Sequence, residues 1–200
     1  MRTRLMAGNF FQGSKAQVRA ALEARRRALS AEEVKAKGGE AQRGLAALSF
    51  FKEANTIALY AAQPFEVPTL ALWTAPRICL PRVSAGARVL SFHLVRDPSA
   101  LVPRGKLQLL EPAEGAPEVN AEEIDCWVVP GVGFTRHGAR LGRGAGYYDA
   151  TLAGARRDAV KVGLTFECCL VDRLPTEPHD VRMDWVVTEL GASAALREDP

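Results

Sequence analysis

Hydrophobic residues recur at helical spacing near the start of the chain. Within 14–29, Val18, Leu22 and Leu29 fall near one side of a helix. The remaining positions include five basic residues: Lys15, Arg19, Arg25, Arg26 and Arg27. The pattern predicts a first helix that packs through an apolar side and carries a basic face.

A second helix is predicted directly after the first. Ser30 and Glu33 have the spacing of a capping box, in which each side chain accepts a hydrogen bond from the other residue's backbone N–H. We expect this helix to run towards Leu48, although Gly38 and Gly39 weaken its middle.

Apolar runs bounded by turn residues alternate with short helical segments over the rest of the chain. The predicted strands are 56–62, 77–83, 124–130, 159–166 and 185–189, with a further apolar run at 89–95. The predicted helices are 67–73 and 147–158. We expect 185–189 to be the last strand, and 124–130 is continuously apolar, as a strand covered on both faces should be. The alternation predicts an α/β fold, with a mostly parallel sheet and helices on both faces in a three-layer, Rossmann-like arrangement.

Length and composition favour one domain. The 200 residues are 48% hydrophobic, which is enough to bury a sizeable core. We expect a single domain over 1–200, with a flexible lead at 1–13 and an irregular, proline-rich segment at 96–121. The formal net charge of +3, from 26 basic and 23 acidic residues, is too balanced for a dedicated nucleic-acid binder but suits an anionic small molecule.

The cysteines indicate a reducing compartment. Cys79, Cys126, Cys168 and Cys169 form no CxxC pair, and the first two lie in apolar runs, where a free thiol behaves as a small buried hydrophobe. We therefore expect no structural zinc. No apolar stretch is long enough for a signal peptide or a membrane span, so we expect a cytoplasmic protein.

The stretch "RLGRGAGYYD" (140–149) places three glycines at alternate positions before a predicted helix. Each glycine costs roughly 0.5–1 kcal/mol relative to alanine in regular structure, which a positive φ or a close approach to a ligand must offset. Free N–H groups at a helix start attract phosphate, and Arg140 and Arg143 would add charge-assisted hydrogen bonds. The GxGxG spacing is neither a P-loop nor a dinucleotide fingerprint. These residues alone are compatible with phosphate binding and with a structural turn.

The loop belongs to a longer pattern with four further landmarks in order. The loop stretch is "PGVGFTRHGARLGRGAGYYDATL". The landmarks are "KAQVR" in the first helix, "YAAQPFEVPT" after a strand, "LPRV" ending the next strand, and "LPTEPHDVRMDWVVTE" near the end. Together they closely resemble the 5-formyltetrahydrofolate cyclo-ligases, also called methenyltetrahydrofolate synthetases, over most of the chain.

The resemblance implies an enzyme, an ATP-dependent ligase of folate one-carbon metabolism. Such an enzyme uses ATP as co-substrate and Mg²⁺ to convert 5-formyltetrahydrofolate into 5,10-methenyltetrahydrofolate, releasing ADP and phosphate. Phosphorylation of the formyl oxygen makes it a leaving group, so catalysis needs positioned cations more than a nucleophilic side chain. The expected partners are ATP and the formyl folate, with no nucleic acid or membrane, and the expected state is a monomer.

The resemblance also implies roles for individual residues. It places Ala61, Glu66 and Leu107 at the folate and Asp149 and Asp180 at Mg²⁺. It makes Arg140 and Tyr148 catalytic. The implied ATP-binding set is Lys15, Arg19, Arg140, Leu141, Gly142, Arg143, Gly144, Ala145, Gly146, Tyr147 and Tyr148. Without the resemblance, structural roles are favoured by roughly two to one, because charged residues on surface helices and turns are usually only solvated. Lys15 and Arg19 would then be a solvated helix face, Asp149 a residue that complements a helix dipole, and Asp180 part of a turn.

Three positions depart from the family pattern, and two other functions stay open. Ala145 replaces a lysine or glycine, Cys169 stands where glutamine is common, and Leu107 occupies a site that is often aromatic. Leu107 and Cys169 suggest a paralogue of the same fold that binds nucleotide with another ligand and lacks cyclo-ligase activity. The basic first helix suggests a nucleic-acid or protein-binding module, against which stand the low net charge and the absence of interleaved aromatic residues.

Overall fold

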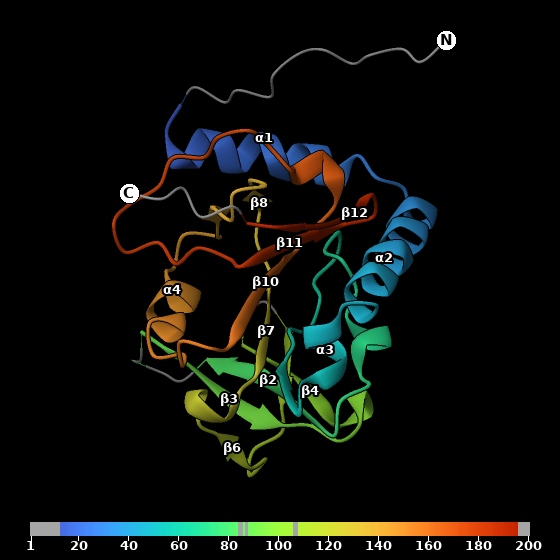
Figure 1. Ribbon diagram of the computed structural model, residues 1–200, viewed down its shortest axis with the longest axis vertical. Helices are drawn as coiled ribbons and strands as arrows, with labels where there is room; N and C mark the ends of the chain where they lie inside the picture. The colour runs from blue at the N-terminus through green and yellow to red at the C-terminus, as the bar shows by residue number, and fades with distance from the viewer. Residues whose placement is uncertain (1–12, 84–85, 87, 106–107, 196–200) are drawn as a thin grey trace.

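The computed structural model describes residues 13–195 apart from 84–85, 87 and 106–107, and these residues build an eight-stranded sheet (Figure 1). In spatial order its strands are β12 (Gly191–Ala194), β11 (Trp185–Thr188), β10 (Val160–Leu164), β7 (Cys126–Val129), β1 (Thr56–Ala58), β2 (Arg77–Val83), β3 (Leu90–Leu94) and β6 (Glu118–Val119). The five strands from β11 to β2 are parallel. β12, β3 and β6 join the two edges antiparallel. The expected mostly parallel sheet is confirmed.

Helices cover both faces of the sheet, as expected. In Figure 1, α2 and α3 lie on one side of the sheet, α4 lies on the other, and α1 crosses above one end of it. The α-helices are α1 (Lys15–Arg27), α2 (Ala31–Ala46), α3 (Ser49–Glu53) and α4 (Tyr147–Leu152). The 3-10 helices are η1 (Leu70–Leu72), η2 (Pro98–Ala100), η3 (Ala121–Glu123) and η4 (Glu167–Cys169). None of the helices in the described residues is long and apolar enough to cross a membrane.

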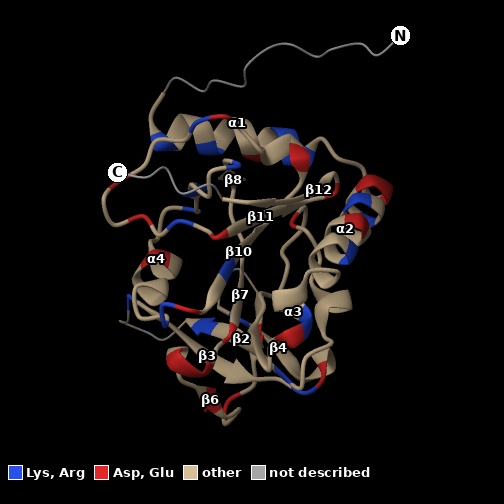
Figure 2. Cartoon of the chain, in the orientation of Figure 1, with Lys and Arg blue, Asp and Glu red and all other residues tan. Residues whose placement is uncertain are grey.

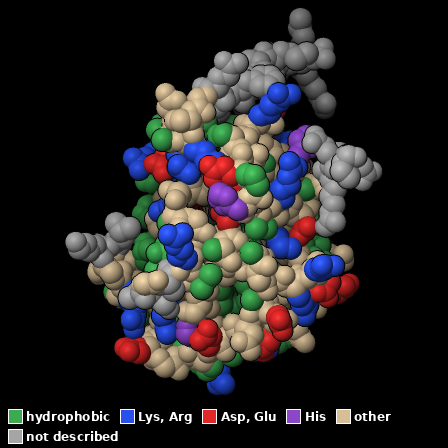
Figure 3. Space-filling model, turned by 90° about the vertical axis from the view of Figure 1, so that its left-hand side faces the viewer, with side chains coloured by type: hydrophobic (Ala, Val, Ile, Leu, Met, Phe, Trp, Pro, Cys, Tyr) green, Lys and Arg blue, Asp and Glu red, His purple; other side chains and the backbone are tan. Residues whose placement is uncertain are grey.

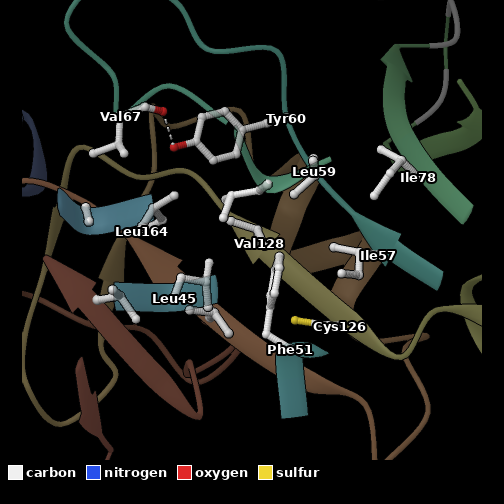
Figure 4. Packing of buried hydrophobic residues seen from close by; sticks show 14 of the residues in the cluster. Leu45, Phe51, Ile57, Leu59, Tyr60, Val67, Ile78, Cys126, Val128 and Leu164 are labelled. Atoms are coloured by element: carbon white, nitrogen blue, oxygen red, sulfur yellow. Dashed lines mark hydrogen bonds between the residues drawn. The ribbon is translucent and has the colours of Figure 1, made fainter. Parts of the chain in front are cut away.

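Strand β7 shows why a continuously apolar run becomes a central strand. Cys126 and Val128 point into the core cluster that contains Leu45 and Phe51 of α2 and α3, part of which is drawn in Figure 4. Trp127 and Val129 point into the cluster on the opposite face. Because successive strand residues alternate between faces, a strand with a core on each side must be apolar throughout. Figure 2 shows the complement of this pattern, with most charges on helices and loops and few on the central strands.

Several elements differ from the sequence prediction at their ends. The second helix stops at Ala46, and a separate short helix, α3, follows it. β1 ends at Ala58, and Tyr60, Ala61 and Gln63 beyond it line a cavity. α4 ends at Leu152, just before Gly154, and does not reach residue 158. The strand β11 is not the last one: Gly191–Ala194 adds β12, whose small residues gave no strand signal.

The segment expected to be irregular, 96–121, holds regular structure. Leu101–Arg104 (β4) and Leu109–Pro112 (β5) form an antiparallel hairpin, and β6 pairs with β3. Prolines lowered the strand signal here, because proline cannot donate to a sheet. A separate two-stranded ladder can accommodate proline because each of its strands has an unpaired side. A second such ladder joins β8 (Gly133–Phe134) to β9 (Arg140–Leu141).

The order of the strands creates a crevice between β1 and β7. These two strands are neighbours, yet the chain leaves β1 for β2 on one side and leaves β7 for β10 on the other. In parallel sheets such a reversal opens a crevice beyond the carboxyl ends of the two strands, and ligands bind there. The fold therefore places the segments after Ala58 and after Val129 at a binding position.

Candidate active site

A cavity of about 480 Å³ lies beyond the carboxyl ends of β1, β2 and β7. Its lining comes from α1, the segment after β1, the end of β2, the β4–β5 hairpin, the loop into α4 and the 177–180 segment. Figure 3 shows the α4 side of the molecule, where basic, acidic and histidine side chains gather above a group of hydrophobic ones. A charged region therefore adjoins an apolar one on this side of the molecule.

The structure brings together every predicted site residue that it describes. The cavity is lined by Lys15, Arg19, Ala61, Glu66, the whole run 140–149, and Asp180. Leu107 lies outside the described residues. Their shared location supports a common role, while the individual roles stay predictions.

The glycine loop is shaped by left-handed backbone and by a close contact with α1. Gly144 has φ +106°, and a Cβ there would lie 3.4 Å from the Cζ of Arg19. The Nε of Arg19 donates to the carbonyl of Gly142 at 2.8 Å, so α1 holds the loop in place. Gly146, the N-cap of α4, has φ +73°. In the described part of the chain, the backbone N–H groups of residues 144–146 donate to no protein acceptor, which leaves them available to an anion.

The α4 helix is shorter than expected, which changes the basis of the anion site. With six residues it has a weak macrodipole. The basic groups that an anion would meet in the cavity are therefore mainly side chains of α1 and of the glycine loop: Lys15, Arg19, Arg140 and Arg143.

Lys15 joins α1 to the 177–180 segment. Its Nζ lies 2.8 Å from Oδ2 of Asp180 and 3.1 Å from Oε2 of Glu177. Burial favours the neutral carboxyl of Asp180, but hydrogen bonds from Lys15 and from the Glu177 N–H outweigh it and hold its pKa below the ordinary value. Both members of this pair are therefore charged at neutral pH.

Arg140 and Asp149 form a second ion pair on the cavity wall. Arg140 is buried, and its Nη2 lies 2.7 Å from Oδ2 of Asp149. The other carboxylate oxygen of Asp149 accepts from the N–H of Val181 at 3.1 Å, which places Asp149 beside the residue that follows Asp180. The Nε of Arg140 is buried without a hydrogen-bond partner among the described residues. An unsatisfied donor of this kind is unfavourable unless a ligand completes it.

Tyr148 presents a second buried donor to the cavity. Its hydroxyl is buried and has no protein partner in the described chain. The Cζ of Arg140 lies 5.7 Å from the centre of its ring, within cation–π range. Burial raises the pKa of the Tyr148 hydroxyl well above its ordinary value. The group therefore stays protonated and can donate a hydrogen bond to a ligand.

Glu66 occupies the opposite wall, in a turn that α2 holds. Its carboxylate is 8% exposed and accepts from the N–H of Gln63 at 2.9 Å. The helix comes unusually close to the segment that follows, since a Cβ on Gly38 would lie 2.6 Å from Cδ of Pro68. The side chain of Gln42 also accepts from the N–H of Ala71 at 3.0 Å. The glycine that weakened the helix prediction is thus the residue that lets the helix hold this wall.

Arg26 does not belong to the basic outer face that the sequence suggested. It is 7% exposed, donates from Nη1 to the carbonyl of Gly131 at 3.3 Å, and lies 3.9 Å from Oε1 of Glu66. The inward position removes one charge from any surface that could bind nucleic acid. It adds a buried cation behind the candidate substrate-binding residue Glu66.

Sequence reasoning missed part of the lining. The missed polar residues are Tyr60, Gln63, Glu111, Glu177 and His179, and the apolar wall consists of Pro81, Val83, Leu90, Leu109 and Leu110. Gln63 and His179 lie within the quoted landmarks and could have been proposed from their neighbours Glu66 and Asp180. Leu109, Leu110 and Glu111 belong to the segment expected to be irregular, where no pattern indicated a wall.

Two of the three positions that depart from the family pattern lie in the described residues. Ala145 lines the cavity and is exposed. Cys169 is fully buried away from the cavity lining, where its Sγ contacts the carbonyl of Leu22 at 3.8 Å. The substitution at Cys169 therefore reaches the cavity indirectly, through the packing of η4 on its neighbours, among them Leu22 of α1.

Oxygen donors for a divalent cation are present on one side of the cavity. Asp149 and Asp180 both line it, and Glu177 and His179 offer ligand atoms within 4.8 Å of those of Asp180. Carboxylate oxygens beside a phosphate-binding loop are the donor set that Mg²⁺ takes in nucleotide sites. The two aspartates fit the expected metal. To bind it, their carboxylates must be released from the ion pairs with Lys15 and Arg140, which would then bind another anion.

Comparisons with known proteins agree with the resemblance seen in the sequence. The sequence profile of the 5-formyltetrahydrofolate cyclo-ligase family matches residues 11–189. The chain is similar to the 5-formyltetrahydrofolate cyclo-ligase of Mycolicibacterium smegmatis, with 34% identity over 200 residues that cover 92% of this chain and 98% of the relative. It is 31% identical over 175 residues to the cyclo-ligase of Escherichia coli K12, covering 82% of this chain and 94% of the relative.

Solved structures give the same result. The 5,10-methenyltetrahydrofolate synthetase of Aquifex aeolicus superposes with a TM-score of 0.78 at 31% identity, covering 93% of this chain and 94% of that one. The 5,10-methenyltetrahydrofolate synthetase of Mycoplasma pneumoniae superposes with a TM-score of 0.72 at 25% identity, covering 88% and 99%.

Proposed function

The chain belongs to the 5-formyltetrahydrofolate cyclo-ligase family, and we propose that it converts 5-formyltetrahydrofolate into 5,10-methenyltetrahydrofolate with ATP as co-substrate and Mg²⁺ as cofactor. The observation that carries the proposal is the composition of one cavity. Four basic side chains and free loop N–H groups lie on one wall, and an apolar wall from β2, β3 and the β4–β5 hairpin lies nearby. A triphosphate suits the first wall and a flat heterocycle suits the second.

The reaction consists of two bond exchanges. The formyl oxygen takes the γ-phosphoryl group of ATP, and ADP leaves. The neighbouring folate N–H nitrogen then attacks the formyl carbon and loses its proton, the carbon–oxygen bond breaks, and phosphate departs. Neither exchange needs a nucleophilic side chain, and the described lining of the cavity contains no serine, threonine or cysteine. Catalysis in such a transfer comes from positioning and from neutralisation of charge.

The chain's own residues supply that neutralisation. Lys15 and Arg19 reach the nucleotide from α1, and Arg140 and Arg143 reach it from the glycine loop. Among the described residues, the buried Nε of Arg140 and the hydroxyl of Tyr148 have no hydrogen-bond acceptor, so an oxygen of the transferred group would complete both. We assign the catalytic role to these two residues.

Asp149 and Asp180 are the residues that would hold Mg²⁺, which when bound would neutralise phosphate oxygens. Each aspartate is now paired with a basic residue that also lines the nucleotide wall. When a triphosphate enters, it competes with the carboxylates for Arg140 and Lys15. The carboxylates are then free to accept a cation.

The folate would lie between Glu66, Ala61 and the apolar wall, with Leu107 as a further contact of the substrate. We also propose that the chain acts as a single-domain monomer in the cytoplasm without nucleic acid. The four cysteines are free, which supports a reducing compartment. The buried position of Arg26 weakens a basic binding surface on α1.

The test is product formation by purified protein. Incubation with 5-formyltetrahydrofolate and ATP in the presence of Mg²⁺ should give the ultraviolet absorbance of the methenyl product, and omission of the metal should abolish it. Folded protein that binds ATP yet forms no methenyl product would contradict the proposal and favour the paralogue interpretation.

A further inference from the structure

Arg143 of the glycine loop spans the cavity to the opposite wall. Its Nη2 lies 2.8 Å from Oε1 of Glu66, and its Nη1 contacts the side-chain oxygen of Gln63. These contacts join the loop expected to bind ATP to the turn expected to bind folate. A single guanidinium thus connects the two candidate subsites.

Glu66 has other partners that do not depend on Arg143. The N–H of Gln63 donates to Oε2, and the buried guanidinium of Arg26 lies 3.9 Å from Oε1. If Arg143 moved away, these groups would still hold the carboxylate in place. Its Oε1 would then be open to a donor on a ligand.

The phosphates of a bound nucleotide would compete with Glu66 for Arg143. Arg143 follows Gly142, whose carbonyl accepts a hydrogen bond from Arg19, so the loop presents it beside the other cations of the nucleotide wall. Its side chain is 42% exposed, whereas that of Glu66 is 8% exposed, so the arginine is the mobile partner. A triphosphate offers several charged oxygens to a guanidinium, against one carboxylate oxygen of Glu66.

We propose that Arg143 is a positioning residue shared by the two subsites. Without nucleotide, Arg143 pairs with Glu66. With nucleotide, Arg143 binds phosphate instead, and Glu66 can accept hydrogen bonds from N–H groups of the folate heterocycle. Nucleotide binding therefore prepares the folate subsite. The inference rests on the proposed function for the identity of the two ligands.

Such sharing makes the two binding events cooperative. If the nucleotide strengthens folate binding by some factor, the folate must strengthen nucleotide binding by the same factor. Substitution of a residue with a merely structural role would weaken the binding of one or both ligands but would leave this coupling factor unchanged. The coupling factor is therefore the quantity to measure.

The experiment is calorimetric titration of the full chain with 5-formyltetrahydrofolate, with and without the Mg²⁺ complex of a non-hydrolysable ATP analogue. In the wild type we expect the analogue to tighten folate binding by about fivefold or more, the lower end of usual coupling factors. In Arg143→Met we expect folate to bind about equally well with and without analogue, because Glu66 is open in both cases. The analogue itself should bind the variant more weakly.

Arg136→Met is the matched control. Arg136 is also an exposed arginine paired with a glutamate, at 2.6 Å from Glu167, but it does not line the cavity. This control should keep the wild-type coupling factor. A coupling factor unchanged in Arg143→Met, or a wild type in which the analogue weakens folate binding, would overturn the inference.

The outcomes separate this inference from the proposed function. A wild type that shows the Arg143-dependent coupling but forms no methenyl product supports the shared arginine and contradicts the proposed reaction. A wild type that forms product with coupling unaffected by Arg143→Met supports the reaction and overturns the shared arginine. Failure of the wild type to bind either ligand overturns both.

Discussion

The Nη2 of Arg140 lies 2.7 Å from Oδ2 of Asp149, so the glycine-loop cation and the candidate metal ligand neutralise each other in this structure. The same holds for Lys15 and Asp180 at 2.8 Å. An entering metal–triphosphate complex carries both signs of charge and can exchange partners with both pairs. The cavity thus stays electrostatically balanced with or without its ligands, which avoids an isolated buried charge.

Asp149→Asn should raise the Mg²⁺ concentration needed for half-maximal rate several-fold, because the amide keeps the shape and removes the charge that attracts the cation. The measurement is initial rate against Mg²⁺ at saturating ATP, with thermal unfolding in parallel. Asp158→Asn removes an exposed carboxylate that pairs with Arg156 and should leave the metal curve unchanged. A lowered melting temperature with an unchanged metal curve would remove Asp149 from the metal site.

Lys15→Ala and Arg19→Ala should each weaken ATP binding roughly tenfold or more, since a hydrogen bond to a charged group contributes roughly 1.5–3 kcal/mol. Direct titration with ATP measures the effect. Arg27→Ala is the control, because Arg27 lies on the same helix, is 69% exposed and does not line the cavity. Unchanged ATP affinity in both cavity variants would show that Lys15 and Arg19 are only part of a solvated helix face.

The neighbouring glycines of α2 should respond to alanine with opposite signs. Gly39→Ala meets only Arg43 at an ordinary 3.6 Å and should stabilise the protein by roughly 0.5–1 kcal/mol through helix propensity. Gly38→Ala places its Cβ 2.6 Å from Pro68 and should destabilise by roughly 1–3 kcal/mol. Chemical denaturation measures both. Stabilisation by Gly38→Ala would show that α2 does not constrain the segment that carries Glu66.

The Lys15–Asp180 ion pair should make the free energy of unfolding depend on pH in the acid range. The pKa of the Asp180 carboxyl lies below its ordinary 3.8, so its contribution is present above that pH and is lost as the pH falls through the folded-state value. The difference in unfolding free energy between wild type and Lys15→Met should therefore be largest near neutral pH and shrink under acid. Lys35→Met, an exposed control on α2, should show a difference that does not vary with pH. A difference for Lys15→Met that stays constant into acid would contradict the ion pair.

The sequence predicted those parts of the fold that depend on local pattern. The capping box at Ser30 is formed by side chains within three residues of each other, and the apolar run of β7 reflects cores on both faces. β12 and the β4–β5 hairpin were missed because pairing with a neighbour, and not their own composition, makes them strands.

The candidate site followed from the sequence only where a motif linked distant segments. The resemblance identified Lys15, Glu66, the glycine loop and Asp180, which the fold brings to one cavity. The inward turn of Arg26 and the bridge from Arg143 to Glu66 could not be predicted, because both depend on how α1 and the loop approach the turn after β1. No spacing within the chain encodes those distances.

The most direct test of the proposed reaction is the ratio of ADP to methenyl product in one reaction mixture, from ADP quantified by chromatography and the methenyl absorbance. Transfer of the γ-phosphoryl group to the formyl oxygen predicts one ADP per methenyl product, with no ADP formed when the formyl folate is omitted. ADP released without folate, or methenyl product formed without ATP, would contradict the proposed function of this cavity.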